Sequence, residues 1–488
     1  MKKIMKVLGF AIAIITMIGL PTIAFSAPGD VFKLNDIPEI KNKKALSTIV
    51  ETGQVWDKIM PYIEEFTKKT GVEVNVERVA SPVVYSKENV ELMGGTGYYD
   101  VVYVETAWTT EWSNHLYKLE DLAKKYDSAG VEGLRKDIAH HSPSIIICGQ
   151  AYGDQMVLPF YTYHMSMFIR QDVFDDPSEK ENFKAKFGYE LKPATSAKEL
   201  NDQGKFFTRK KGEMLKGKPL DHDIYGLAIM AGAYQINDEI SCRMWGKGAD
   251  YATVVRDSSG KLKEFVITKK DKAALKETFK EYKEDLKWSS PGCLTANFDF
   301  VVAQQGEGRA IIQPHQFSNC FAWTASIVKK KVPDGKLGVY PTVGNQPYTG
   351  AWSVGVAKAS KNPEAAYWLV RYLASKECHE AVMKEGGQLS TRVDVLSDPM
   401  WQTPENKYPY GILCDYLIDS WKKQAQYVPD YWYFNTKAGG KVYEMQMNVF
   451  HKPMAGEASV DKAVNEVVTK TLQLTSKFDK TVPIREEK

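Results

Sequence analysis

The stretch Tyr99-Asp100-Val101-Val102-Tyr103-Val104 is rich in β-branched and aromatic residues, and it predicts a buried strand. Upstream, Val72-Glu73-Val74-Asn75-Val76 alternates apolar and polar residues, which is typical of a half-buried strand. Residues 62–69 before it indicate a helix that ends at Gly71, a common C-terminal cap. We expect Pro61 to begin that helix, because proline suits a first turn and breaks a helix interior.

Another helix is predicted to begin in Ser360-Lys361-Asn362-Pro363-Glu364. Asn362 suits an N-cap, Pro363 a first helical position, and Glu364 the positive end of the helix dipole. The residues that follow form one apolar stripe: Ala365, Trp368, Leu369, Tyr372 and Leu373. Helices that alternate with strands predict an α/β fold with largely parallel sheets. Ligands of such sheets bind beyond the carboxyl ends of the strands.

The N-terminus has the three parts of a secretory signal peptide. Met1-Lys2-Lys3 is basic, residues 7–20 are apolar and uncharged, and Ala24-Phe25-Ser26-Ala27 offers a cleavage site with small residues. The apolar run would reach only about 21 Å as a helix, which is short of a roughly 30 Å bilayer core and disfavours an uncleaved anchor. We expect residues 1–26 to be removed on export and the protein to be periplasmic.

Charge and cysteine content narrow the function further. Removal of residues 1–26 takes away three lysines and no acid, which leaves 61 basic and 61 acidic residues. That balance gives no support for binding to nucleic acids or anionic membranes. Six widely spaced cysteines permit disulfides in an oxidising compartment, while free buried thiols are the alternative: Cys148, Cys242, Cys293, Cys320, Cys378 and Cys414.

Six further segments occur in an order and spacing that carry a family resemblance. They are Gly97–Val104 with Trp108 and 116–122; Tyr152-Gly153 with 158–160 and 168–174; 187–200; 306–312; Gly350-Ala351-Trp352-Ser353-Val354-Gly355-Val356; and 454–463. Together they resemble the family 1 extracellular solute-binding proteins, the maltose-binding-protein-like receptors of ABC sugar importers. Two positions depart from the family pattern: Ser196 stands where tryptophan is usual, and Ser390 where proline is common.

The resemblance implies a two-lobed periplasmic-binding-protein fold of type II, with hinge-linked lobes and a central ligand cleft. We place the chain crossings near Tyr161, Asn345 and Glu380. The first lobe then comprises 27–161 and 345–380, and the second comprises 162–344 and 381–488. Such receptors close on a ligand by a hinge motion and present the closed form to ABC transporter permease subunits. We expect a monomer that needs no cofactor and no metal.

Residue chemistry and position then select a candidate ligand site. Aromatic rings cover the apolar faces of sugars, while carboxylates, amides and arginine bind the hydroxyl groups. Glu105 and Trp108 follow a predicted strand, and Tyr163 falls at the first crossing. The full set of candidates is Glu105, Trp108, Tyr163, Trp245, His315, Gln316, Trp352 and Arg392. For each of them a structural role is the alternative, a surface salt bridge in the case of Arg392.

Other tempting residues are assigned to structure. We expect the aromatic residues Tyr427, Tyr431, Trp432, Tyr433 and Phe434 to pack within a lobe. The adjacent His140 and His141 are expected in a solvated turn, and His164 as a hydrogen-bonded interior histidine. Tyr161 is a weaker ligand candidate than Tyr163.

Two other functions are weighed against a sugar or polyol receptor. A secreted glycoside hydrolase would need a pair of carboxylates, and the sequence lacks a G-x-S-x-G elbow, an H-E-x-x-H helix and a glycine-rich phosphate loop. We therefore do not expect an enzyme. A receptor of the same fold for a polyamine, a glycerol phosphoester or a carboxylate is the closer alternative, because several Trp and Tyr residues favour a neutral carbohydrate or polyol only moderately.

Overall fold

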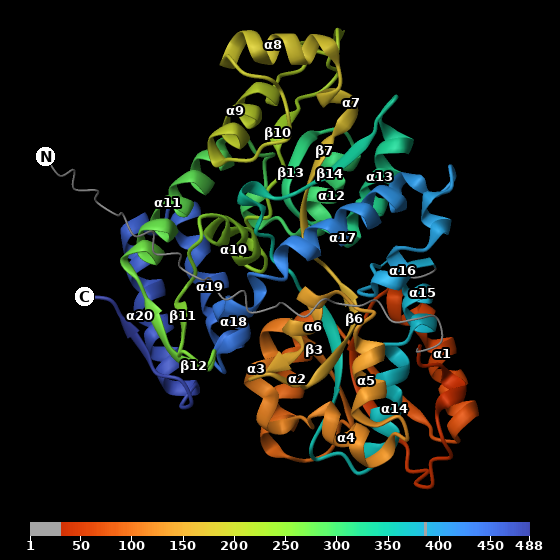
Figure 1. Cartoon of the computed structure of the whole chain (residues 1–488). Coiled ribbons are helices and arrows are strands. Elements are labelled where there is room, and N and C mark those ends of the chain that lie inside the picture. The colour runs from red at the N-terminus through yellow and green to blue at the C-terminus, as the bar shows by residue number, and fades with distance from the viewer. Residues whose placement is uncertain (1–30, 385–387) are drawn as a thin grey trace, which may run out of the picture.

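Two sheets, each with its own helices, form the two lobes of the molecule (Figure 1). The computed structural model describes residues 31–384 and 388–488, so the predicted signal peptide lies outside the described part of the chain. The five-stranded sheet of the first lobe has the order β2 (Val74–Val79), β1 (Leu46–Glu51), β3 (Val101–Glu105), β15 (Ala351–Val356) and β6 (Val157–Thr162). The four-stranded sheet of the second lobe has the order β10 (Tyr225–Leu227), β13 (Ala310–Phe317), β7 (Met165–Arg170) and β14 (Leu337–Tyr340). The predicted two-lobed α/β fold is confirmed.

Both sheets are mixed, so the prediction of largely parallel sheets is only partly right. In the first sheet β2, β1 and β3 are parallel, whereas β15 runs antiparallel to its neighbours β3 and β6. In the second sheet β13 is parallel to β10 but antiparallel to β7, and β14 also runs antiparallel to β7. The two reversed strands are β15 and β7, and each follows a passage from the other lobe. A strand that enters from the other lobe starts at the edge where its neighbours end, and it therefore runs in the opposite direction.

Helices cover these sheets and are spread over the whole chain (Figure 1). Those of the first lobe are α1 (Gln54–Thr70), α2 (Ser81–Gly94), α3 (Thr109–Trp112), α4 (Leu119–Tyr126), α5 (Gly130–Ile138), α6 (Pro143–Cys148), α14 (Pro363–Leu373) and α15 (Lys376–Lys384). Those of the second lobe are α7 (Gln171–Phe174), α8 (Pro177–Phe187), α9 (Ala197–Phe207), α10 (Ile236–Gly246), α12 (Phe298–Gly306), α13 (Phe321–Lys331), α16 (Val393–Leu396) and α17 (Ile412–Gln424).

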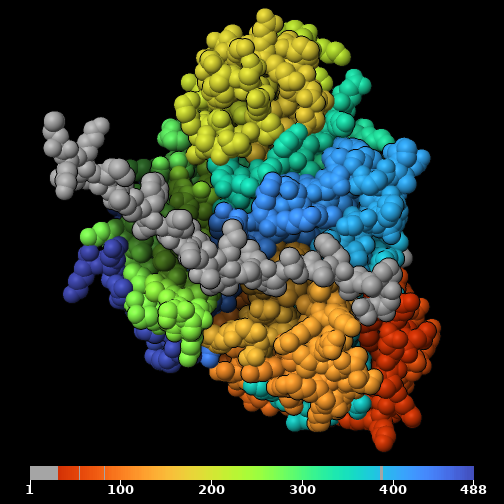
Figure 2. All heavy atoms as spheres, in the orientation of Figure 1, coloured from red at the N-terminus to blue at the C-terminus, as the bar shows by residue number. Residues whose placement is uncertain are grey.

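A third group of elements lies beside both lobes. It consists of the small sheet β11 (Thr253–Arg256), β12 (Leu262–Ile267) and β16 (Ile484–Glu486), with α11 (Lys269–Asp285), α18 (Trp432–Asn435), α19 (Gly439–Met454) and α20 (Val460–Phe478). Helices α18 and α19 contact α3 of the first lobe, while α19 also contacts α10. In Figure 2 the red and orange atoms of the first lobe lie below the yellow and teal atoms of the second. The C-terminal helices therefore connect the two lobes.

Two short hairpins complete the strands: β4 (Gln150–Ala151) with β5 (Asp154–Gln155), and β8 (Met214–Leu215) with β9 (Lys218–Pro219).

The first long helix differs from the prediction at its start. Helix α1 begins at Gln54, so Pro61 lies inside it and does not begin it, whereas the predicted cap at Gly71 is present with φ of 68°. An interior proline costs roughly 3 kcal/mol, because it removes a hydrogen bond and crowds the preceding turn. Burial of an apolar stripe on both sides of Pro61 offsets that cost: Trp56, Ile59, Ile63 and Phe66. The strands predicted at 72–76 and 99–104 exist, but each begins two residues later.

The predicted start of α14 is confirmed. Asn362 is its N-cap and accepts a hydrogen bond from the N–H of Ala365 at 3.4 Å, and Pro363 is its first residue. The apolar stripe predicted for this helix is buried together with the residues between its members, from Ala365 to Leu373. The helix contacts β15 and β6 of the sheet and also the helices α4 and α15, which accounts for the burial of consecutive residues.

The chain passes between the two sheets at places near the proposed crossings. β6 ends at Thr162 in one sheet and β7 begins at Met165 in the other. The chain returns to the first sheet between β14 and β15. A third passage lies between α15 and α16, since α15 packs on β6 of the first lobe and α16 packs on α17 of the second. The exact lobe boundaries stay a prediction.

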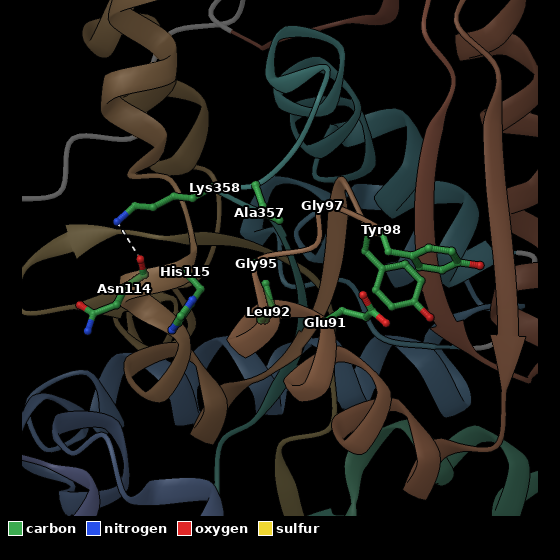
Figure 3. Close-up of a pocket in the computed structure, with 11 residues that line it drawn as sticks. Glu91, Leu92, Gly95, Gly97, Tyr98, Asn114, His115, Ala357 and Lys358 are labelled. Carbon is green, nitrogen blue, oxygen red and sulfur yellow. Dashed lines mark hydrogen bonds between the residues drawn. The ribbon is translucent and has the colours of Figure 1, made fainter.

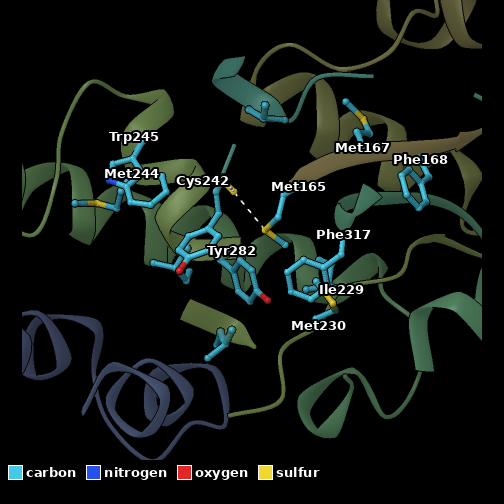
Figure 4. Packing of buried hydrophobic residues seen from close by; sticks show 14 of the residues in the cluster. Met165, Met167, Phe168, Ile229, Met230, Cys242, Met244, Trp245, Tyr282 and Phe317 are labelled. Carbon is cyan, nitrogen blue, oxygen red and sulfur yellow. Dashed lines mark hydrogen bonds between the residues drawn. The ribbon is translucent and has the colours of Figure 1, made fainter. Parts of the chain in front are cut away.

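The second lobe has an extensive core in which the cysteines take part (Figure 4). Cys242 on α10 lies with its sulfur 3.6 Å from that of Met165, among Met230, Phe317 and other apolar side chains. All six cysteines are buried and none forms a disulfide, so of the two alternatives left open by their spacing, free buried thiols are found. In the described ranges, no helix is long and apolar enough to cross a membrane.

The histidines are more buried than the sequence predicts. His140 and His141 are 8% and 2% exposed, so the predicted solvated turn is wrong. The ring of His141 bonds to Thr391 at 2.8 Å, while that of His140 lies 3.3 Å from a carboxylate oxygen of Asp394. His164 is an interior histidine as predicted, with ring nitrogens 2.9 Å from the hydroxyls of Thr349 and Ser420.

Candidate ligand-binding site

Register brings four side chains to the carboxyl edge of the five-stranded sheet. β1 and β3 are parallel, so their last residues, Glu51 and Glu105, lie at the same edge. Trp352, near the start of β15, is in register with Glu105 on one side and with Tyr161 on the other. Residues as far apart in the sequence as Glu51 and Trp352 therefore meet at the edge where α/β sheets bind ligands.

Hydrogen bonds from the first lobe and from both passages between the sheets fix the carboxylate of Glu105. It accepts the N–H of Ala107 at 2.7 Å, which makes Glu105 the N-cap of the short 3-10 helix Thr106–Trp108. It also accepts the hydroxyls of Tyr163 and, at 3.0 Å, of Tyr348. Burial raises the pKa of Glu105, and these donors only partly offset that rise. Glu105 therefore joins the strand edge to the segment through which the chain returns from the second lobe.

An aromatic cluster surrounds this edge in the first lobe. The ring of Trp352 stacks on that of Tyr103 with centroids 4.4 Å apart and planes at 1°, and Trp108 meets Trp352 edge-on at 5.4 Å. Trp108 also packs against Tyr85 and Trp112. Trp352 is 9% exposed and Trp108 is half-buried. One face of the Trp352 ring is therefore covered by Tyr103.

Trp245 lies in a second aromatic cluster, on α10 of the second lobe. It is 3% exposed and stacks on Tyr431 at 4.2 Å and 5°, and on Tyr348 at 5.7 Å and 20°. With two tyrosines stacked against it, Trp245 is mainly a packing residue in this structure. Of the C-terminal aromatic residues predicted to pack within a lobe, Tyr431, Trp432, Tyr433 and Phe434 are buried and Tyr427 is 45% exposed. Helix α18, which carries three of them, also contacts α3 of the first lobe.

Tyr163 lies at the first passage between the sheets and links the two clusters. Its hydroxyl donates to Glu105, and its ring is nearly parallel to that of Tyr348 at 6.4 Å. A Cβ at Gly350 would lie 1.9 Å from the Tyr163 ring, so this glycine makes room for the tyrosine. The sequence prediction overlooked Tyr348, although its place just before Gly350 in a crossing segment was a usable signal.

His315 and Gln316 lie on β13, inside the second lobe. His315 is 1% exposed, and its Nδ1 lies 3.6 Å from a carboxylate oxygen of Glu239. The Gln316 amide donates to the carbonyl of Phe298 at 3.3 Å and accepts the N–H of Phe317 at 2.7 Å. Neither side chain is brought to Glu105 by a contact in this structure.

Arg392 is held in a buried ion-pair network. It is fully buried and donates to Asp394 at 3.0 and 2.9 Å, to Asp137 at 3.1 Å and to the carbonyl of Ala374 at 3.2 Å. These acceptors use most of its guanidinium donors, so we leave Arg392 out of the proposed site. The network is internal and not the surface salt bridge weighed as its alternative.

Three acidic or aromatic residues near this edge were not among the sequence candidates. Glu51 ends β1 and accepts the hydroxyls of Tyr161 and, at 3.2 Å, of Tyr103. Asp238, on α10, is 4% exposed and accepts the hydroxyl of Tyr443 at 2.9 Å. Tyr234, just before α10, is 47% exposed. Of the three, only Glu51 could have been proposed from the sequence, because it is an acid at the end of a predictable strand.

A cavity of about 270 Å³ lies at the opposite end of the same sheet (Figure 3). It is lined by residues before β3, after β15 and in the 3-10 helix Ser113–His115, among them Gly97, Tyr98, His115 and Lys358. Lys358 donates to the carbonyl of Asn114 at 2.9 Å across it. This is the amino end of β3, whereas Glu105 marks the carboxyl end, so the cavity is separate from the candidate site. Among the residues that the structure describes, no group of three or more His, Cys, Asp or Glu side chains could hold a metal ion.

Solved structures of solute-binding proteins share this fold along most of the chain. One from Agrobacterium radiobacter in complex with ribitol has a TM-score of 0.66 at 18% identity and covers 90% of this chain and 100% of its own. One from Agrobacterium vitis with bound D-mannitol has a TM-score of 0.65 at 18% identity, with 89% and 99% covered. Maltose-bound MalE3 of T. maritima has a TM-score of 0.63 at 18% identity, with 88% and 98% covered. At such identities these similarities establish the fold alone.

A comparison of sequences gives the family. No curated protein matches the chain. The model of the bacterial extracellular solute-binding proteins matches residues 53–378, a range that includes β3, the passages through Tyr163 and Tyr348, and β15. That family consists of solute-binding receptors and is not a family of enzymes. The chain belongs to the bacterial extracellular solute-binding protein family.

Proposed function

We propose that this chain is an exported, periplasmic receptor that captures a carbohydrate or polyol at the carboxyl edge of its first sheet and delivers it to an ABC importer permease. The observation that supports it best is that Glu105, at the end of β3, is bonded to both passages between the sheets, since its carboxylate accepts the hydroxyls of Tyr163 and Tyr348. Carboxylates and tyrosine hydroxyls are groups that bind sugar hydroxyls, and nearby Trp352 and Trp108 offer apolar ring surface. The sugars and polyols bound by proteins of the same fold agree with this proposal.

The proposed site is smaller than the predicted one. It keeps Glu105, Trp108, Tyr163 and Trp352, and adds Tyr348. Trp245 contributes through Tyr348, on which it stacks. A hinge at the passages near Thr162 and Gly350 would open and close the site, since the chain changes lobes there.

Melting temperature against a solute panel tests the proposal. The panel contains mono- and oligosaccharides, polyols, polyamines and organic acids, and the protein is refolded first to remove bound solute. A ligand at about a hundred times its dissociation constant stabilises the folded state by roughly 2.7 kcal/mol, so we expect a clear upward shift with at least one sugar or polyol. A shift with acids alone would overturn the carbohydrate assignment.

A pair of variants separates binding from folding. Trp108→Ala should weaken binding of the solute found in the panel, because it removes ring surface beside Glu105. Trp323→Ala is the matched control: this tryptophan, on α13 of the second lobe, is 45% exposed and should leave binding unchanged. Equal binding by both variants would show that the ligand does not use this aromatic cluster.

A further inference from the structure

The two lobes also touch at a place away from the three passages of the chain. Helix α18 and the first turn of α19 contact α3 of the first lobe and the 3-10 helix Thr106–Trp108 that precedes it (Figure 1). We call the C-terminal side of this contact, residues 432–441, the C-terminal segment. Because the chain does not pass between the lobes here, the contact is made by packing alone, and a hinge motion can break it.

The C-terminal segment is anchored on the second lobe. The N–H of Trp432 donates to the carboxylate of Asp250 at 2.8 Å, and this acid is 8% exposed. Just after the segment, the hydroxyl of Tyr443 donates to Asp238 on α10 at 2.9 Å. The buried side chains of the segment belong to the same apolar core as the strands of the second lobe. We therefore expect the segment to move with that lobe.

One buried hydrogen bond crosses the contact. The hydroxyl of Thr110, on α3, donates to the carbonyl of Phe434 at 2.7 Å, and Thr110 is 1% exposed. At the exposed edge of the contact, the ammonium of Lys437 lies 5.7 Å from the ring centre of Tyr152, in the hairpin of β4 and β5. The contact thus combines a directed bond in its interior with a cation–π pair at its edge.

Gly440 makes the close approach of the lobes possible. A Cβ on this residue would lie 2.5 Å from a carboxylate oxygen of Glu111, 3.3 Å from the ring of Trp108 and 3.4 Å from the ring of Tyr85. These three nearest neighbours all belong to the first lobe. The next residue, Lys441, places its ammonium 4.7 Å over the ring of Tyr85. The lack of a side chain at Gly440 therefore serves the contact between the lobes.

The contact includes a residue of the proposed ligand site. Trp108, which faces Gly440, offers ring surface in that site, and Thr110 follows it by two positions. Glu105 is the N-cap of the 3-10 helix that ends at Trp108. The movement that encloses a solute between the lobes is therefore the one that brings the C-terminal segment onto α3.

We propose that the C-terminal segment is a clasp, which fastens on Tyr85, Trp108 and Thr110 when the lobes close. Gly440 sets how closely it can fasten. Closure then depends on two separate parts of the chain, because the passages form the hinge and the clasp holds the lobes together away from it. The inference rests on the hinge motion of the proposed function and adds the part that holds the closed form.

Gly440→Leu tests the clasp. Leucine would collide with Trp108 and Tyr85, while its helix propensity suits the first turn of α19. Gly94→Leu is the matched control: this exposed glycine ends α2, and a Cβ there would have only an ordinary van der Waals neighbour, at 3.4 Å. Melting of each variant without solute verifies that it folds.

Small-angle X-ray scattering of the exported chain measures closure as the radius of gyration. It is recorded without solute and with D-mannitol, ribitol and maltose as probes, since structures of the same fold bind them. We expect the parent and Gly94→Leu to reach the radius of this structure in at least one condition, and Gly440→Leu to stay larger in that condition. Titration of the probe that binds should show an affinity about tenfold lower in Gly440→Leu, because overpacking disfavours the closed form.

Thr110→Val tests the same contact from the first lobe without added bulk. It should weaken binding of that probe about two- to tenfold, because in the closed form no water replaces the donor that the carbonyl of Phe434 loses. Thr403→Val is the matched control, since its hydroxyl donates to the carbonyl of Met400 at 3.2 Å, and it should keep the affinity of the parent.

The outcomes separate the clasp from the proposed function. If Gly440→Leu and Gly94→Leu have the same radius in every condition, the clasp is rejected, while a melting shift with a sugar or polyol still supports the receptor. A Gly440→Leu variant that melts far below the parent without solute but keeps its affinity would show permanent packing and would also reject the clasp. If Gly440→Leu alone is expanded and no sugar or polyol shifts the melting temperature, the clasp stands and the proposed function fails.

Discussion

Two groups of buried carboxylates in this molecule are held in opposite ways. In the first lobe and next to it, acids are paired with arginines: Arg371 with Asp127 at 2.8 Å and with Asp137 at 3.5 Å, and Arg392 with Asp137 and Asp394. We call these residues the arginine-paired cluster. Glu51, Glu105 and Asp238, which we call the tyrosine-bonded acids, accept tyrosine hydroxyls instead. The same chain thus neutralises one set of buried charges and leaves another unneutralised.

The difference separates structural charge from charge that is available to a ligand. Burial alone would raise the pKa of Asp394, but the hydrogen bonds and the charge of Arg392 hold it below its ordinary value. No arginine acts on Asp238 in this way, and its pKa is raised. Perturbed, unpaired acids at a ligand edge indicate function more strongly than acids in a closed ion-pair network. Variants that break each group should therefore fail in different ways.

The largest effect is expected from Arg392→Met. Removal of the guanidinium leaves Asp137 and Asp394 buried without their cation, which typically costs about 3–5 kcal/mol of unfolding free energy. Urea denaturation measures it. The matched control is Arg309→Met, whose exposed pair with Glu307 should contribute less than about 1 kcal/mol. Equal stability of the two variants would contradict the structural role of the arginine-paired cluster.

The second-largest effect on stability is expected from Trp245→Ala. Its indole is stacked against Tyr431 and Tyr348 and is 3% exposed, so truncation should cost about 3 kcal/mol of stability through the cavity it leaves. Denaturation without solute and titration with solute measure folding and binding separately. A variant of normal stability that binds weakly would return Trp245 to the ligand site, where the sequence placed it.

These two residues show what the sequence can and cannot predict. The strand that ends at Glu105, the helix that begins at Pro363 and the two-lobed fold follow from local patterns and from the family resemblance, and all are confirmed. The partners of a residue follow from register and passage between sheets, which local patterns do not contain. Arg392 and Trp245 looked like ligand residues because arginine and tryptophan suit both cores and sites. Asp238 attracted no attention, because only the packing of α10 brings it near Glu105.

The pH dependence of stability should have opposite signs in the two groups. Asp394 has a lowered pKa in the folded protein, so its stabilising contribution is present above its ordinary pKa of about 4 and is lost as the pH falls through its folded value. Asp238 has a raised pKa, so the fold loses stability as the pH rises from about 4 toward its folded value and the acid ionises.

Difference curves isolate the two acids from all other titrating groups. The unfolding free energy of the parent minus that of Asp394→Asn should shrink toward low pH, and that of the parent minus Asp238→Asn should fall toward neutral pH. Each unit of pKa shift corresponds to about 1.4 kcal/mol, so changes of about 1 kcal/mol or more are expected. Curves of the same sign would remove the distinction between paired and unpaired acids.

The smallest effect, and the sharpest for the ligand, is expected from Tyr234→Ala. The ring is 47% exposed, so its loss should leave the unfolding free energy almost unchanged. Contact of a solute with an exposed aromatic ring is worth about 0.5–1 kcal/mol, which predicts a two- to fivefold loss of affinity for the sugar or polyol found in the panel. Tyr98→Ala, at a 59% exposed tyrosine at the amino end of β3, is the control and should keep the affinity of the parent. Equal affinity of Tyr234→Ala and Tyr98→Ala would show that the solute does not contact the Tyr234 ring, and the proposed site would then end at the first lobe and the two passages.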